Sequence, residues 1–125
     1  MDGFGAIFPI AGRCQSRAFR TDGGLLFGVA ASKGFDEDPL SGDITEHAEA
    51  AFARMSEVLE GAGLTRADVC FVNVYLHDVL KDVAAFNIVW RQYFEGLSPA
   101  RCCVGVTLQT GILVEMVFVA QQPDS

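Results

Sequence analysis

Residues 69–76 read VCFVNVYL, and this apolar run constrains the fold more than any other segment. Apolar side chains on nearly every position are typical of a strand covered on both faces, whereas a half-exposed strand alternates apolar with polar residues. The chain has 125 residues, of which 50% are hydrophobic, which predicts a single domain, 1–125. A domain of this size buries only about two-thirds of the surface of its unfolded chain, so we expect apolar surface to be left over for a subunit interface.

Two helices are expected where apolar residues recur at helical spacing. The first begins at Asp43, a typical N-cap, with Glu46 three residues further on, and it ends at Gly61 or Gly63. The second presents one apolar face over residues 83–94.

Strands are expected before, between and after these helices. Asp22-Gly23 supplies the positive φ of a tight primed turn, so the residues on either side of it predict a hairpin. Residues 1–15 show no period and predict an irregular lead-in. Residues 32–42 combine turn formers with acids that do not fit a calcium loop, and they predict a solvated loop. The expected strands are residues 16–20, 25–31, 69–76, 101–107 and 113–120, and residues 121–125 form a polar tail.

The expected order is therefore β-β-α-β-α-β-β, an α+β subunit with two helices on one face of a sheet. Helices on one face cannot cover the other. If residues 69–76 are apolar on both sides, the uncovered face needs another partner, and a second copy of the same sheet is the simplest one.

The charge of the chain excludes some partners. Lys+Arg number 9 against Asp+Glu 16, for a formal net charge of -7, and the basic residues are scattered along the sequence. Nucleic acids and anionic membranes are therefore not expected as partners. No segment approaches the roughly 18 consecutive apolar residues of a membrane span, and the N-terminus lacks the features of a signal peptide. We expect an intracellular, cytoplasmic protein.

No metal or other cofactor is expected. His47 is predicted on the polar side of the first helix and His77 at a strand end, and neither has a Cys or carboxylate at ligand spacing. The cysteines lack zinc-type spacing and are predicted to be reduced, buried thiols, with adjacent Cys102 and Cys103 pointing to opposite faces of a strand. The cysteines are Cys14, Cys70, Cys102 and Cys103.

Glu115 is the most informative polar residue. It lies in GILVEMVFVA, where it alternates with Leu113 and Val117 on one strand face while the other face is also apolar. A carboxylate in such a place is costly unless it is paired, protonated or lining a cavity. Something must therefore compensate Glu115.

Arg101, at the start of the preceding strand, is one candidate partner for a carboxylate, because its planar donor fork suits that group. Two interpretations are open. Arg101 and Glu115 form a salt bridge or are solvated at strand ends, or else Arg101 anchors an anionic substrate and Glu115 handles protons.

Asn87 lies on the apolar face of the second helix, between Phe86 and Trp90. An Asn in this place either satisfies a backbone group or contacts a ligand.

Three segments of the chain resemble one family. They are SRAFRTDGGLLF, the stretch from DITEHAEAAF to FNIVW, and PARCCVGVTLQTGILVEMVFVA, and together they run from about residue 16 to 120. All three are similar to the Rid family, the RidA/YjgF reactive-intermediate deaminases. The last is the most specific, because members typically read Pro-Ala-Arg-Ser-Cys-Val, then a strand and a turn, then Ala-Leu-Val-Glu-Ile.

The resemblance implies a chorismate-mutase-like subunit with a mixed sheet, and a homotrimer whose sheets form an inner barrel with sites in the clefts between subunits. It also implies metal-free hydrolysis of enamines and imines, such as 2-aminoacrylate, to a keto acid and ammonia. Arg101 then binds the carboxylate of a small substrate, Glu115 positions or activates water, Cys103 lines the site largely through its backbone, and Asn87 lies near it.

The chain departs from the family at the pocket wall. Gln15 stands where many deaminases carry a tyrosine that faces the substrate. Gly28-Val29-Ala30-Ala31 replaces the usual Val-Ser-Gly-Gln, which removes a hydroxyl and puts Ala30 in place of a glycine whose backbone approaches the substrate. These departures admit a specialised deaminase, as with 2-aminomuconate deaminases. The alternative from another class is a noncatalytic Rid-like protein that binds a small metabolite.

Overall fold

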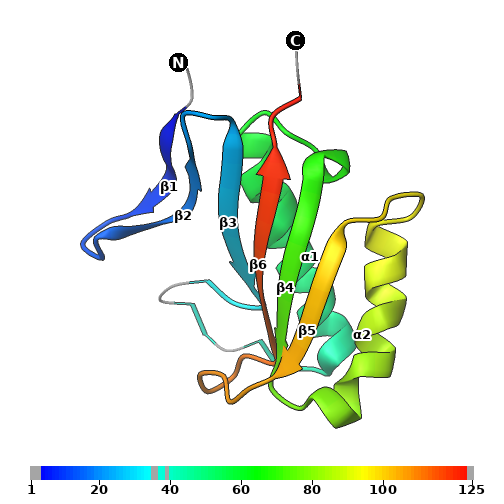
Figure 1. Ribbon diagram of the computed structural model, residues 1–125. Helices are drawn as coiled ribbons and strands as arrows, with labels where there is room; N and C mark the ends of the chain where they lie inside the picture. Colours follow the sequence, from blue (N-terminus) through cyan, green and yellow to red (C-terminus); the bar gives the residue numbers. More distant parts are fainter. Residues whose placement is uncertain (1–3, 35–36, 39, 124–125) are drawn as a thin grey trace.

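Six strands form one mixed sheet in the order β1-β2-β3-β6-β4-β5 (Figure 1). The computed structural model describes residues 4–34, 37–38 and 40–123, so parts of the predicted lead-in, loop and tail lie outside the described residues. Among the described strands, β4 and β5 pair in parallel and all other neighbours pair antiparallel. The strands are β1 (Gly5–Ile10), β2 (Gln15–Arg20), β3 (Leu25–Ala31), β4 (Val69–Leu76), β5 (Ala100–Gly105) and β6 (Val114–Gln121).

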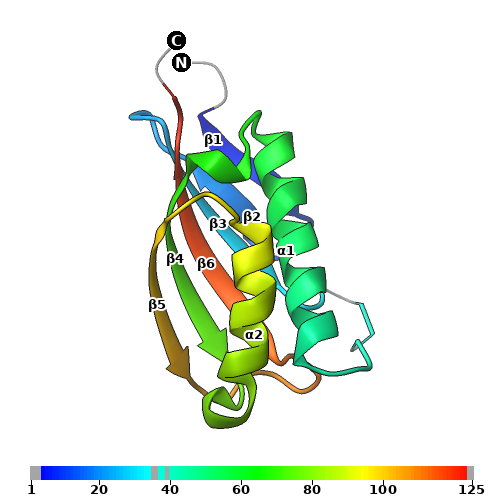
Figure 2. The ribbon, with the colours of Figure 1, turned by 90° about the vertical axis from the view of Figure 1, so that its right-hand side faces the viewer.

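Two helices cover one face of this sheet, as predicted (Figure 2). Asp43 is the N-cap of the first and accepts a hydrogen bond from the backbone N–H of Glu46 at 3.2 Å. Gly63 and Gly96, just beyond the two helices, have φ of 73° and 77°, the left-handed conformation in which helices commonly end. The α+β class is confirmed. The helices are α1 (Ile44–Gly61) and α2 (Val79–Tyr93), with a short 3-10 helix, η1 (Arg66–Asp68), before β4.

The predicted irregular lead-in is wrong where the chain forms β1, and β2 begins already at Gln15. β1 is an edge strand. The alternation of apolar and polar side chains along it is broken at Pro9 and at Phe8, whose φ is 54°. Phe8 is also 41% exposed. A strand prediction needs a period of two, and this segment does not show one because an edge strand can tolerate proline and an irregular backbone.

The β2–β3 hairpin is confirmed, but its turn differs from the predicted primed turn. The positive φ falls on Gly24, at 87°, and not on Asp22 or Gly23. The N–H of Gly24 donates to the carbonyl of Thr21 at 3.0 Å, and the N–H of Thr21 donates to the carbonyl of Leu25 at 2.8 Å. This is the pattern of a type I turn followed by a left-handed glycine, which needs one residue more than the primed turn.

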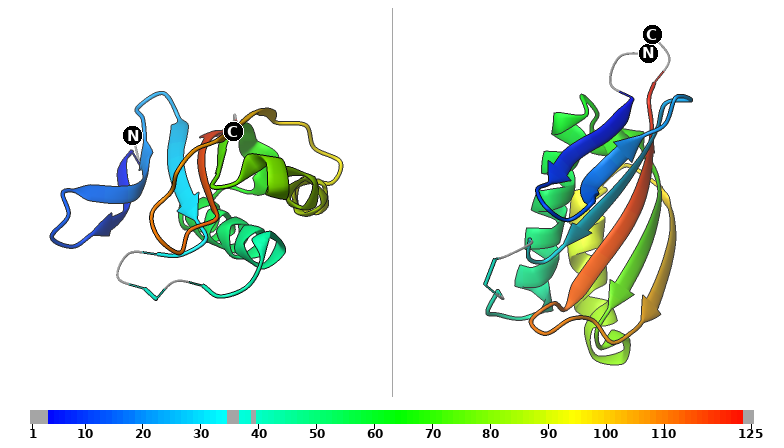
Figure 3. Two further views of the ribbon diagram at one scale, coloured as in Figure 1. Left: turned by 90° about the horizontal axis from the view of Figure 1, so that it is seen from below. Right: turned by 90° about the vertical axis from the view of Figure 1, so that its left-hand side faces the viewer.

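β2 stays beside β3 for only part of its length. The two strands pair from Ala18–Gly28 to Arg20–Leu26, and beyond Gly28 the chain of β2 leaves β3 and projects with β1 from the rest of the sheet (Figure 3). This fork between β2 and β3 is where the cavity described below lies.

The core fills the space between the sheet and the two helices. Alternate residues of the central strands point toward the helices and are fully buried, among them Val72 and Val74 of β4 and Met116 and Phe118 of β6. Gly28 pairs with Phe118, whose ring fills the space that a side chain at position 28 would need. None of the described helices is both long and apolar enough to cross a membrane.

The opposite face of the sheet is apolar but half exposed in the single chain. Phe71 and Tyr75 of β4 are partly exposed there, and Phe27, Val29 and Val104 are 43–44% exposed. The run at residues 69–76 is therefore buried on its helix-facing side and open on its other side, within one chain.

Two predictions about single residues are wrong. His47 does not lie on the polar side of α1: it is buried, with Nδ1 2.8 Å from the hydroxyl of Ser32 and Nε2 3.0 Å from the carbonyl of Leu40, because the chain after β3 folds over it. The cysteines are free, as predicted, but they are not buried in the chain. Cys103 is partly exposed, and the exposed ones are Cys14, Cys70 and Cys102.

Candidate functional site

Arg101 lies on the edge strand β5 and is held against α2. Its guanidinium carbon is 4.8 Å from the ring centroid of Trp90 and 5.5 Å from that of Phe86. Its Nη2 donates a hydrogen bond of 2.6 Å to Oδ1 of Asn87. The aromatic rings attract the cation and the amide fixes its direction, while a guanidinium has further N–H groups to offer a carboxylate. Asn87 therefore positions Arg101, a role that neither of the two options for this Asn included.

Glu115 faces the other side of the sheet. It pairs with Ala31 on β3 and Tyr75 on β4, whereas Arg101 pairs with the buried Val72. Tyr75 and Val72 are three residues apart on one strand, so their side chains point to opposite faces. Arg101 is on the helix side and Glu115 is on the open side, and a salt bridge between them within one chain is excluded.

A cavity of about 410 Å³ lies beside Glu115, in the fork between β2 and β3. Gln15 contributes from β2, Val29 and Ala31 from β3, and Ile112 from the segment before β6. A cavity of this size suits a small molecule. The sequence left Glu115 needing a charge partner or a cavity, and the structure provides the cavity.

The cavity wall clarifies two predicted site residues. Gln15 is exposed and lines the cavity, and its contact with a substrate stays a prediction. The side chain of Ala30 is buried, with 1% exposed, and Ala30 pairs with Met116 in the core. Its neighbours Val29 and Ala31 line the cavity, so Ala30 can reach a ligand there only through its backbone.

Cys103 is partly buried on the helix side of β5, and Cys102 lies on the opposite face, as predicted. The N–H of Val106 donates to the carbonyl of Leu76 on β4. Because backbone polar groups alternate sides along a strand, those of Cys103 face away from β4, at the edge of the described sheet. This leaves the Cys103 backbone accessible beside Arg101.

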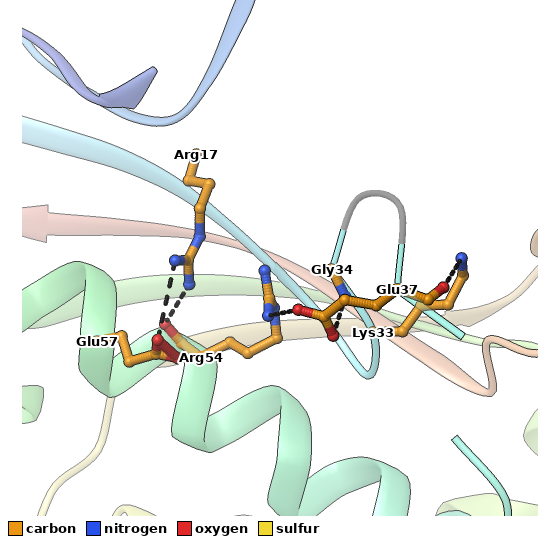
Figure 4. A network of polar contacts seen from close by, with 6 residues as sticks. All are labelled: Arg17, Lys33, Gly34, Glu37, Arg54 and Glu57. Atoms are coloured by element: carbon orange, nitrogen blue, oxygen red, sulfur yellow. Dashed lines mark hydrogen bonds and ion pairs between the residues drawn. The ribbon is translucent and has the colours of Figure 1, made fainter. Parts of the chain in front are cut away.

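Basic residues gather at the cavity, although they are scattered in the sequence. Arg13, Arg17, Lys33 and Arg54 all line it, so four of the chain's 9 Lys and Arg surround one small space. Arg17 is on β2, Lys33 follows β3 and Arg54 is on α1 (Figure 4), while Arg13 precedes β2. Nothing in the sequence indicates this cluster, because only the tertiary fold brings residue 54 to residue 17.

Arg17 and Arg54 belong to one polar network at this cavity. Arg17 donates through Nη2 to the backbone carbonyl of Arg54 at 3.3 Å and lies 3.9 Å from Glu57. Arg54 in turn lies 3.4 Å from Glu37. Burial lowers the pKa of Arg17, and the neighbouring positive charge of Arg54 lowers that pKa further. Among the described residues, no three His, Cys, Asp or Glu side chains gather as metal ligands do.

Comparison with known proteins places these residues in a family. The family model described as Endoribonuclease L-PSP matches residues 16–122. HMF1 of Saccharomyces cerevisiae is 30% identical over 117 residues, 93% of this chain and 90% of that protein. A 2-iminobutanoate/2-iminopropanoate deaminase of Capra hircus is 35% identical over 91 residues, 68% of this chain and 66% of that protein. The mitochondrial protein MMF1 of S. cerevisiae is 36% identical over 68% of this chain, and the chain spans 59% of its length.

Solved structures share the fold. The crystal structure of yeast Mmf1 superposes with a TM-score of 0.82 at 29% identity, and the match covers 94% of this chain and 94% of the Mmf1 chain. A conserved Rid family protein of unknown function, YyfA from Yersinia pestis, covers 92% of this chain and 93% of its own with a TM-score of 0.82 at 25% identity. Because both its sequence and its fold match these proteins, the chain belongs to the Rid family, the RidA/YjgF proteins that the Endoribonuclease L-PSP model describes.

Proposed function

We propose that this protein hydrolyses reactive imines and enamines of small carboxylic acids to a keto acid and ammonia. The observation that carries the proposal is the fixed cation of Arg101, which lies on an edge strand and is held by Asn87 and two aromatic rings of α2. In the same chain, Glu115 lines a cavity. Relatives named 2-iminobutanoate/2-iminopropanoate deaminase support this chemistry.

The reaction needs few groups. Water adds to the carbon of the C=N bond, and Glu115 accepts a proton from that water as its oxygen attacks. That proton passes to the nitrogen and gives a carbinolamine. The proton of its new hydroxyl then also moves to the nitrogen, the C–N bond breaks, and ammonia leaves as the carbonyl forms. An enamine first tautomerises to the imine and then follows the same path. The imine carbon is already electrophilic, so a positioned carboxylate and a fixed cation for the substrate carboxylate are sufficient.

Arg101 and Glu115 lie on opposite faces of one sheet, so a single chain does not bring them to one substrate. We propose that the protein is a homotrimer in which Arg101 of one subunit meets Glu115 of the next. The half-exposed apolar face of β3, β4 and β5 supports this arrangement, because a face of that kind needs a cover and a cyclic oligomer supplies one.

The cytoplasmic location expected from the sequence stays a prediction.

An assay with imines made in place tests the proposed reaction. An amino-acid oxidase acting on alanine or 2-aminobutanoate supplies 2-iminopropanoate or 2-iminobutanoate, and a dehydratase acting on serine supplies 2-aminoacrylate. We expect each to disappear faster with the protein than in buffer. If none of the imines, including larger ones, is hydrolysed faster, the protein is not a deaminase, and metabolite binding without catalysis is the remaining function.

Glu115→Gln is expected to lower kcat by about a hundredfold, with little change in KM, because the amide keeps the shape of the carboxylate but cannot accept a proton. Steady-state kinetics with 2-iminobutanoate measures both constants. Glu60→Gln, which removes an exposed carboxylate of α1 outside the cavity, is the matched control and should be unchanged. A Glu115→Gln protein with wild-type kcat would remove this residue from the proton transfer.

A further inference from the structure

The cavity at Glu115 holds more positive charge than the proposed hydrolysis needs. Arg101 already serves the substrate carboxylate in that proposal, yet Arg17, Lys33 and Arg54 line the cavity as well. In a chain with a net charge of -7, so many cations around one space call for a separate explanation.

The charges that balance these cations lie outside the cavity. The side chains of Arg17 and Arg54 are 19% and 20% exposed, whereas their partners Glu57 and Glu37 are 57% and 58% exposed. Exposed carboxylates are well solvated and compensate a buried cation weakly. Neither of these two glutamates lines the cavity. Among the described residues that line it, Glu115 is the one that carries a carboxylate.

Arg17 shows that its charge is incompletely compensated. Its Nε is buried and has no hydrogen-bond partner in the structure. Burial, followed by the charge of Arg54, lowers the pKa of Arg17, which means that the folded chain disfavours the charged form. An anion in the cavity would place negative charge beside both arginines and compensate this charge.

The cations also come from separate parts of the fold. Arg17 is on β2, Arg54 is on α1, and Lys33 follows β3. Figure 4 shows these side chains with their polar partners Glu57 and Glu37, and Glu37 also accepts a hydrogen bond from the backbone N–H of Gly34. Arg17 donates a hydrogen bond to the carbonyl of Arg54 at 3.3 Å, and Arg54 donates one to Glu37 at 3.4 Å.

We propose that the cavity binds a second carboxylate of the substrate, so that the protein acts on imines or enamines of dicarboxylic acids. The proposal rests on the proposed function. One carboxylate, next to the imine carbon, is bound by Arg101 of a neighbouring subunit, and the distal carboxylate is bound by Arg17 and Arg54, with Lys33 adding to the positive field. The reacting carbon then lies between them, within reach of Glu115.

Kinetics with matched substrates tests this assignment. The imine of glutamate, which carries two carboxylates, is compared with the imine of 2-aminobutanoate, which carries one, each made in place by an oxidase. We expect wild-type kcat/KM to favour the dicarboxylate by about tenfold or more, as the loss of a charged hydrogen bond would imply. In Arg17→Gln and Arg54→Gln the ratio should fall to about one, whereas the exposed Arg91→Gln, outside the cavity, should keep it. An equal preference in wild type would overturn the proposal.

Calorimetry separates this proposal from the deaminase activity. Glutarate should bind to the wild-type protein at least about tenfold more tightly than butyrate, and Arg17→Gln should remove the difference. If imines are hydrolysed but glutarate binds no better than butyrate, the dicarboxylate assignment fails and the deaminase remains. If no imine is hydrolysed while glutarate binds in an Arg17-dependent way, the dicarboxylate site stands and the deaminase fails. Inorganic phosphate binding as tightly as glutarate would indicate a general anion site and would also overturn the assignment.

Discussion

We expect Arg101→Ala to lower kcat/KM for imine hydrolysis by about a thousandfold, because truncating one partner of a desolvated charge pair is among the costliest single changes in a binding site. The same change should leave the subunit folded. Arg101 is partly exposed on an edge strand, and the contacts it loses are one hydrogen bond to Asn87 and cation–π contacts with Trp90 and Phe86. Contacts of this kind contribute about 1–2 kcal/mol together. Circular dichroism and light scattering check folding and mass beside the kinetics.

Two further variants separate the charge of Arg101 from its positioning. Arg101→Lys keeps the charge but loses the planar fork, so it should recover only part of the activity. Asn87→Ala keeps the guanidinium but removes the oxygen that holds it at 2.6 Å, so KM should rise more than kcat falls. Wild-type kinetics in Arg101→Ala would remove Arg101 from the substrate site.

The second large effect is on stability. Phe52→Ala is expected to destabilise the folded chain by about 3–5 kcal/mol, because it removes a buried ring and leaves a cavity behind. Phe52 is 3% exposed, and its ring centroid lies 4.4–6.2 Å from four rings of α2 and the residue after it. These rings are Phe86, Trp90, Tyr93 and Phe94.

Urea unfolding at a fixed protein concentration measures this change. Leu80→Ala is the matched control: Leu80 is also apolar and lies on α2, but it is 94% exposed, so its loss should change the free energy of unfolding by less than about 0.5 kcal/mol. Equal effects of the two substitutions would show that the aromatic cluster does not hold α1 and α2 together. Because Phe86 and Trp90 also contact Arg101, the same cluster links the stability of the subunit to the position of this cation.

The sequence was sufficient for the elements that carry a clear period or cap. Asp43 and the apolar spacing that follows it predict α1, and the run at residues 69–76 predicts β4. β1 was not predictable, because Pro9 and the positive φ of Phe8 break the alternation of an edge strand. Burial of His47 was also not predictable, since it depends on the Ser32 hydroxyl and the Leu40 carbonyl, which tertiary folding brings to the imidazole.

In the candidate site, too, some features could be predicted from the sequence and others could not. The unusual position of Glu115 in an apolar strand pointed to a cavity, and Arg101 stood out as a carboxylate-binding side chain. The sequence did not indicate that they face opposite sides of the sheet, because that depends on how β5 and β6 register against β4. The cluster of Arg17 with Arg54 was hidden for a similar reason: it forms only where β2 leaves β3 above α1.

The central claim is that a deaminase site forms from Arg101 of one subunit and Glu115 of another, and mixing two inactive variants tests it most directly. Arg101→Ala and Glu115→Gln proteins are partly unfolded together and refolded at equal concentrations, and native mass spectrometry verifies that hybrid trimers form. We expect about a quarter of wild-type activity to return, because random assortment of subunits in a cyclic trimer places intact Arg101 opposite intact Glu115 at about one site in four. Verified hybrids with no more activity than the parent variants would contradict the account.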